Sequence, residues 1–231
     1  MPESNLEQLI TAARLLRPVL GELVFVGGSV TGLLITDEAA GVPRATLDVD
    51  AIAEITSYAE YAAFGDRLRA LKFVEDASHG APLCRWIHED TILDVMPLDE
   101  KILGFSNRWY RAAMEVAVAR RLLDDLEIRM VTAPFFLATK LEAFKGRGKG
   151  DLFGSRDLED LISIIDGRST TVAEVRAQTP ELQKYIRIEI SRLLARQGFL
   201  DALPGYLLPD AASQSRVSTV LARLEELAVV P

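Results

Sequence analysis

The sequence predicts a mixed α/β (α+β) fold, in which a small mixed sheet flanked by helices is followed by a helical C-terminal domain. Apolar runs of strand length lie mainly in the first half of the chain, whereas apolar residues at helical spacing dominate after about residue 104. The chain has 231 residues and 49% hydrophobic content, which is enough for a sizeable core. We therefore expect two domains, at residues 1–131 and 132–231.

Helices and short strands alternate in the N-terminal half. Apolar spacing predicts helices over 4–17 and 57–71, and a short helix after residue 29. Turn-forming residues separate the last three of five apolar runs, which is typical of a hairpin or meander. The predicted strands are 23–27, 45–53, 72–75, 83–87 and 91–96.

One further strand and four helices are expected in the remainder of the chain. The strand is predicted at 126–131, after which Thr132 provides a helix cap and Pro134 a first-turn proline. A glycine-rich stretch at 146–150 interrupts the helices, and Ser155 caps the next one. The four helices are predicted to run from Pro134 to Phe144 and over 156–166, 179–198 and 214–228.

The composition narrows the classes of function. A net charge of −8 and a pI near 4.9 argue against a broad nucleic-acid-binding surface. No apolar run reaches the ~18 residues of a membrane span, and the N-terminus lacks signal-peptide features, so we expect a cytoplasmic protein without membrane contact. Cys84 is expected to be a buried, inert thiol. His79 and His88 lack the spacing of zinc ligands.

A glycine-rich turn follows the first predicted strand. Gly27-Gly28-Ser29 comes directly after the apolar run 23–26 and precedes a predicted helix. Free backbone N–H groups, a hydroxyl and the positive end of a helix dipole together suit a phosphate. Glycines are also routine in strand-to-helix turns, so the turn indicates a phosphate site only in combination with the carboxylates that follow it.

Two aspartates alternate along the second predicted strand. The period of two residues places Asp48 and Asp50 on one face. Oxygen ligands placed in this way suit Mg²⁺, including pairs of ions that hold the attacking and leaving oxygens of an in-line displacement. The alternative is solvated charge on an exposed strand, although Leu47 and Val49 are typical of a buried one. Asp94, in an apolar run, is expected to be a third ligand or a general base.

A lysine interrupts an apolar helix stripe in the C-terminal half. Lys140 lies between Leu137 and Leu141 and is expected either to extend to solvent or to point into a cleft toward a triphosphate. On the second interpretation, Lys140→Met should keep or slightly raise thermal stability. Asp157 and Asp160 begin the following helix, where acids also complement the helix dipole without any further function.

Together these motifs resemble the nucleotidyltransferase superfamily, and most closely its AbiEii/AbiGii toxin family. The resemblance covers about residues 23–165, and the 146–150 insertion leaves the choice between Asp157 and Asp160 open. The matching segments are 27–29, 44–50, 93–95, 132–134, 140–143 and 155–161.

The resemblance implies a nucleotidyltransferase-type fold and transfer of NMP from an NTP to an acceptor hydroxyl, with Mg²⁺ as cofactor and the nucleotide in a cleft between two domains. The implied metal ligands are Asp48, Asp50 and Asp94. The implied nucleotide-binding residues are Gly28, Ser29, Arg44 and Lys140, and the implied catalytic residues are Asp48, Asp50, Asp94, Lys140 and Asp157.

The acceptor is not determined by these motifs. The resemblance implies an AbiEii-like toxin of a toxin–antitoxin or phage-defence system that acts on RNA such as tRNA, with a cognate antitoxin as partner. Lys145, Arg147 and Lys149 are the expected RNA path. A small-molecule acceptor, as in antibiotic adenylyltransferases, is the alternative, because acidic charge attracts a cation. A non-catalytic, partner-binding homologue is a third possibility, against which the retained aspartates argue.

Overall fold

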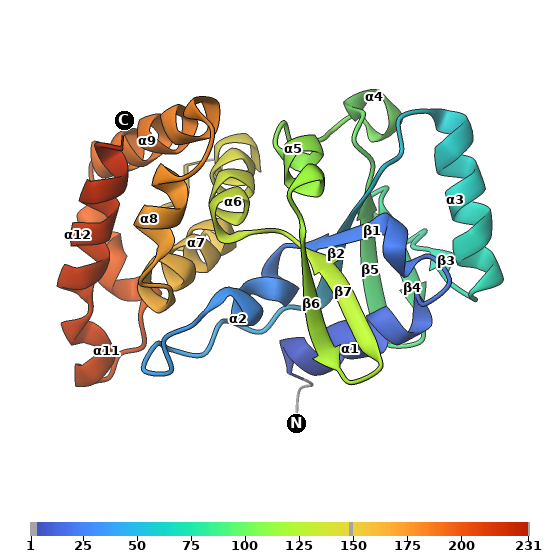
Figure 1. The fold of residues 1–231 in the computed structure, drawn as a ribbon, viewed down its shortest axis with the longest axis horizontal. Helices are drawn as coiled ribbons and strands as arrows, with labels where there is room; N and C mark the ends of the chain where they lie inside the picture. Colours follow the sequence, from blue (N-terminus) through green and yellow to red (C-terminus); the bar gives the residue numbers. More distant parts are fainter. Residues whose placement is uncertain (1–3, 148–149, 231) are drawn as a thin grey trace. The chain divides into compact units, whose positions relative to one another are not determined.

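The computed structural model describes residues 4–147 and 150–230, which fold as two compact units (Figure 1). The first unit comprises Met1–Val30 and Ala45–Thr132, and the second comprises Thr31–Arg44 and Ala133–Pro231. A segment from the N-terminal half of the sequence therefore belongs to the second unit. The division at residue 131, made from the sequence, remains a prediction for the functional domains.

The first unit contains a seven-stranded mixed sheet with strand order β3-β4-β5-β2-β1-β7-β6. β2 pairs in parallel with β5 and β1 with β7, whereas the remaining neighbours are antiparallel. The predicted mixed α/β fold is thus confirmed. The strands are β1 Leu23–Val26, β2 Asp48–Ala53, β3 Val74–Glu75, β4 Arg85–His88, β5 Thr91–Met96, β6 Val118–Leu123 and β7 Leu126–Met130.

Helices cover this sheet and complete its core. α1 contacts β2, β5 and β7, and it begins at a capping box in which Ser4 and Glu7 satisfy each other's backbone N–H groups. Phe25 of β1 and Trp86 of β4 are among the largest fully buried side chains. The helices are α1 Asn5–Leu15, η1 Leu20–Glu22, η2 Gly28–Val30, α3 Tyr58–Ala70, α4 Glu100–Leu103 and α5 Tyr110–Glu115.

Among its described residues, the second unit contains helices joined by loops and no strand. α6 packs on α7, α8 and α9, and α12 packs on the same three helices. Ser155 caps α7 as predicted, and the segment 31–44 is attached through backbone N–H groups of Thr36 and Asp37 that donate to Gly167. The helices are α2 Thr31–Leu34, α6 Ala133–Arg147, α7 Arg156–Gly167, α8 Thr171–Arg176, α9 Pro180–Leu194, α10 Phe199–Ala202, η3 Leu203–Tyr206, α11 Ala211–Ser215 and α12 Val217–Ala228.

Several local expectations were wrong. β6 was not predicted, because this edge strand is largely exposed and lacks alternation of apolar and polar residues. β2 begins at Asp48, and Leu47 is 73% exposed and not part of a buried strand. Within the described residues, the Thr132 hydroxyl has no hydrogen-bond partner and does not cap α6, whose second residue, Pro134, has no N–H to be capped.

None of the helices in the described part of the chain combines the length and the apolar character that a membrane span requires.

Candidate active site

The turn after β1 lies against the carboxylate of Asp50. β1 and β2 are antiparallel with Val26 opposite Asp50, so the chain leaves β1 beside this aspartate. Gly27 has a φ of +71°, and a Cβ added there would lie 1.9 Å from Oδ2 of Asp50. Only glycine fits this backbone conformation and this approach. The adjacency of the turn and the aspartate pair, expected from the sequence, is therefore a feature of the sheet register.

The turn itself differs from the expected helix N-terminus. Gly28 and Ser29 are buried, and the Ser29 hydroxyl donates a hydrogen bond to the carbonyl of Val26 at 3.3 Å. η2 and the four-residue α2 follow the turn, in line with the short helix predicted after residue 29. A strong helix dipole is thus not available, because the macrodipole needs several aligned turns. Phosphate binding by Gly28 and Ser29 remains a prediction.

Three carboxylates lie on one face of two neighbouring strands. Asp48 and Asp50 alternate with buried Val49 along β2, as predicted. β5 runs parallel to β2 and places Asp94 directly opposite Asp50. Thr46 supports the first aspartate by donating from Oγ1 to Oδ1 of Asp48 at 2.8 Å. The sheet register therefore brings together all three predicted metal ligands.

Arg85, which the sequence analysis did not single out, joins this face from β4. β4 and β5 are antiparallel with Arg85 opposite Asp94. The Nε and Nη2 atoms of Arg85 each donate to a different oxygen of Asp94 at 2.8 Å, and Nη2 also donates to Oδ2 of Asp48 at 2.8 Å. The hydrogen bonds that Arg85 donates to Asp94 hold the pKa of Arg85 above its usual value. Arg85 is a charged residue within the apolar run 83–87, and a hairpin between this run and 91–96 places it opposite Asp94. This signal could have identified Arg85 as a site residue from the sequence.

The donor set fits a divalent cation only in part. Asp48 and Asp50 offer carboxylate oxygens on one strand face, which suits Mg²⁺. Across residues 4–147 and 150–230, however, no group of three or more His, Cys, Asp or Glu side chains is placed to hold a metal ion. Both oxygens of Asp94 accept from Arg85. The metal assignments remain predictions, and the geometry favours the Asp48–Asp50 pair.

Cys84 behaves as expected for a buried thiol. It is 3% exposed, and burial, followed by the charges of Asp94 and Asp50, raises its pKa to about 12. The thiolate is therefore absent near neutral pH, and no nucleophilic role is indicated.

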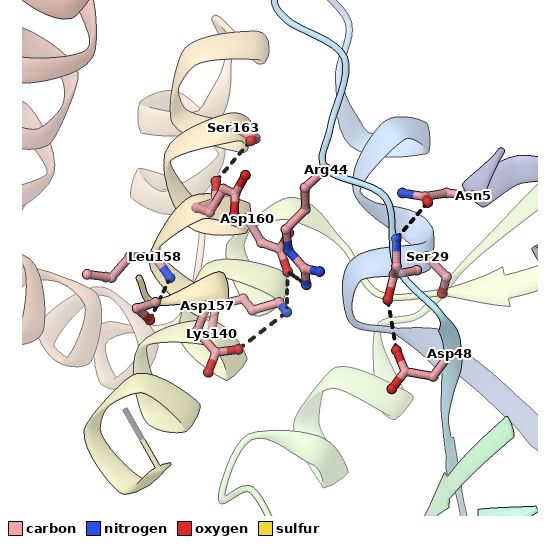
Figure 2. A network of polar contacts seen from close by, with 12 residues as sticks. Asn5, Ser29, Arg44, Asp48, Lys140, Asp157, Leu158, Asp160 and Ser163 are labelled. Atoms are coloured by element: carbon pink, nitrogen blue, oxygen red, sulfur yellow. Dashed lines mark hydrogen bonds and ion pairs between the residues drawn. The ribbon is translucent and has the colours of Figure 1, made fainter. Parts of the chain in front are cut away.

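A second charge cluster lies within the helical unit. Nζ of Lys140, on α6, is 2.6 Å from Oδ2 of Asp160 and 3.4 Å from Oδ1 of Asp157, both on α7 (Figure 2). Arg44 is 2.9 Å from the same oxygen of Asp160. Lys140 is 6% exposed, so the extension of its ammonium group to solvent is wrong. These four side chains, the Arg44–Lys140–Asp157–Asp160 cluster, balance two positive against two negative charges.

This cluster also changes two expectations that concern its acids. Asp160 accepts contacts from both cations and is 1% exposed, so it is not merely an acid placed to complement the helix dipole. Asp157 takes the longer contact with Lys140. The geometry thus favours Asp160 as the principal partner of Lys140. Because Lys140 compensates buried carboxylates, the expectation that Lys140→Met keeps or raises stability no longer holds.

A cavity of about 320 Å³ lies in the second unit, beside Arg44. Glu159 lines it, and within the described residues its carboxylate makes no hydrogen bond or ion pair. Burial raises the pKa of Glu159. Asp166 lines the same cavity but is paired with Arg216 at 2.7 Å. The cavity therefore offers a half-buried carboxylate that a positively charged group could neutralise.

Comparisons with known proteins find similar structures but no matching family. No family model and no curated protein matches the chain. An antigenic nucleotidyltransferase-like protein from Paracoccidioides brasiliensis is similar with a TM-score of 0.48 and 19% identity, over 84% of this chain and 92% of that one. JHP933 from Helicobacter pylori is similar with a TM-score of 0.43 and 12% identity, over 97% of this chain and 90% of that one. Neither likeness is strong enough to transfer an activity or a site residue.

Proposed function

We propose that this protein is a Mg²⁺-dependent nucleotidyltransferase that transfers NMP from an NTP to an acceptor hydroxyl and releases pyrophosphate. The observation that carries the proposal is the carboxylate pair Asp48 and Asp50 on one face of β2, with the Gly27 turn against Asp50. Turn and carboxylates are adjacent through the β1–β2 register and not merely close in sequence. This combination supports phosphate chemistry better than either motif alone.

In this proposal, Asp48 and Asp50 hold the cation. Bound Mg²⁺ would offset the negative charge of the triphosphate and favour ionisation of the acceptor hydroxyl. Thr46 fixes the side chain of Asp48 through its hydroxyl. The absence of a side chain at Gly27 keeps the backbone of the turn close to Asp50, where its N–H groups would bind phosphate oxygens.

Lys140 and Arg44 are the cations that we assign to the triphosphate. The support is their common partner, because both contact Oδ2 of Asp160. A triphosphate carries more negative charge than one carboxylate and would compete with Asp160 for them. Their present pairing with Asp157 and Asp160 would then keep the two cations in place before substrate binds.

The acceptor that we propose first is RNA, as in an AbiEii-like toxin with a cognate antitoxin, and this rests on the sequence resemblance. Lys145 belongs to the proposed RNA path and lies within the described residues. Its ammonium group lies 3.9 Å from Glu142 and 3.8 Å from Glu189, and these carboxylates partly offset its charge. The side chain of Arg147 and the whole of Lys149 lie outside the described residues.

A small cationic acceptor is the second candidate, and the cavity beside Arg44 favours it. Glu159 supplies a carboxylate without a hydrogen-bond or ion-pair partner in the described part of the chain, and Val42 and Ile162 supply apolar walls. An amine on a hydroxylated ring system matches both features, because the ammonium pairs with the carboxylate and the ring contacts the walls.

Incubation with each radiolabelled NTP and Mg²⁺ tests these proposals, with total RNA or an aminoglycoside as acceptor. We expect label on RNA from the native protein and none from Asp48→Asn/Asp50→Asn. Glu159→Gln is the matched control, since it should lower labelling of an aminoglycoside and leave labelling of RNA unchanged. Labelling of the aminoglycoside alone would select the second candidate. No labelled product with any NTP would contradict the transferase and favour a non-catalytic homologue.

A further inference from the structure

Arg85 joins two strands of the carboxylate face. Its guanidinium contacts Asp94 through two nitrogens and Asp48 through one, all at 2.8 Å. The Arg85 side chain is 21% exposed and that of Asp94 is 8% exposed. A simple cross-strand pair would involve only Asp94, its register partner. The additional contact with Asp48 extends from β4 across β5 to β2, so Arg85 has a wider role than holding one strand to its neighbour.

We propose that Arg85 takes the place of a divalent cation on the Asp94 side of this face, so that Asp94 positions Arg85 and the cation is held by Asp48 and Asp50. This inference rests on the proposed nucleotidyl transfer. Asp94 then acts as a positioning residue and not as a metal ligand. Arg85 itself supplies a fixed positive charge at the site where a second cation would otherwise lie.

The geometry of the guanidinium supports this assignment. A planar fork that donates to both oxygens of one carboxylate is the pairing that arginine makes best, and its charge persists at any physiological pH. A cation bound to Asp94 would compete with both hydrogen bonds that Asp94 accepts from Arg85, whereas at Asp48 it would compete with one. The absence of a three-carboxylate metal group among the described residues agrees with this arrangement.

The local charge balance points in the same direction. Asp48, Asp50 and Asp94 carry three negative charges, and Arg85 offsets one of them. Each divalent cation adds two positive charges beside Arg85, so a second cation is disfavoured before nucleotide binds. Arg85 also competes with the cation for Asp48, because it donates to Oδ2 of that residue. Removal of Arg85 should therefore strengthen cation binding.

Titration with Mn²⁺ in the absence of nucleotide tests the inference, with calorimetry for affinity and electron paramagnetic resonance for free Mn²⁺. We expect one Mn²⁺ per native chain. Arg85→Gln should bind Mn²⁺ about tenfold more tightly or gain a second ion, the size of change typical of residues next to a metal site. Arg69→Gln is the control, because Arg69 pairs with exposed Asp66 and Glu75 and should leave binding unchanged.

A double variant keeps the test decisive if Arg85→Gln is poorly folded. Arg85→Gln/Asp94→Asn removes both charges of the pair and should retain one Mn²⁺ with native or higher affinity. If Asp94 were a ligand, this variant would lose affinity about tenfold or more. That loss, or unchanged binding in folded Arg85→Gln, would overturn the inference while leaving the transferase intact. Identical Mn²⁺ binding in native protein and Asp48→Asn/Asp50→Asn would overturn both.

Discussion

Replacement of Lys140 by methionine tests whether the buried charge cluster of the second unit requires balanced charge. Methionine has a similar length and no charge. Lys140 is 6% exposed and Asp160 1% exposed, with 2.6 Å between their charged atoms. In Lys140→Met, Asp157 and Asp160 would retain two negative charges with Arg44 as the remaining cation of the cluster. We therefore expect the variant to unfold at a lower denaturant concentration than the native protein.

The size of this loss follows from the burial of the cluster. Removal of one partner from a buried ion pair typically costs about 3–5 kcal/mol, because the other charge is left uncompensated. Arg44 remains 2.9 Å from Asp160 and keeps part of the compensation. We therefore expect a loss of about 3 kcal/mol, the lower end of that range. For a chain of this size, that corresponds to a decrease in Tm of about 6–12 °C.

Urea unfolding followed by circular dichroism measures the loss. Lys145→Met, on the same helix, is the control, because Lys145 is half-exposed and its loss should cost at most about 1 kcal/mol. Lys140→Met/Asp157→Asn leaves one pair, Arg44 with Asp160, and should recover more than half of the stability. A midpoint for Lys140→Met at or above the native value would refute the reasoning and restore the sequence-based expectation.

Three further predictions concern the carboxylates and the turn. In Asp48→Asn/Asp50→Asn, calorimetry should show that NTP affinity no longer rises with Mg²⁺, and an equal metal response in both proteins would contradict a cation held by this pair. Gly27→Ala should lower the free energy of unfolding by about 1–3 kcal/mol or more, because φ is +71° and the new Cβ would overlap Asp50; Gly21→Ala, with open space around its Cβ, should stay near native. Burial raises the pKa of Glu159 above its usual 4.5. At a pH above this raised pKa, Glu159 is ionised in the folded protein and lowers its stability, whereas at a pH below 4.5 it is neutral and has no such effect. Glu159→Gln should therefore raise Tm at pH 7, with the gain lost at about pH 4, and an equal gain at both pH values would argue against this cause.

Local sequence patterns were sufficient to predict those features that depend only on residues close together in the chain. The shared face of Asp48 and Asp50 follows from the period of a strand, and the structure confirms it. The cap that Ser155 forms on α7 was likewise predicted, since a cap depends on residues within one turn. β6 was missed because its pairing with β7, and not its own apolar pattern, makes it a strand.

The sequence by itself therefore determined the mixed α/β class, the shared face of the two aspartates and the presence of a glycine-rich turn after the first strand. Tertiary structure decided which charges meet. Arg85 reaches Asp94 and Asp48 only through the register of β4, β5 and β2. Lys140 meets Asp160 because α6 packs on α7, and the segment carrying Arg44 joins the second unit through contacts with α7 and an ion pair between Asp37 and Arg216. The physical reason is that a charge in an apolar run must find a partner, while burial alone does not specify which distant residue supplies it.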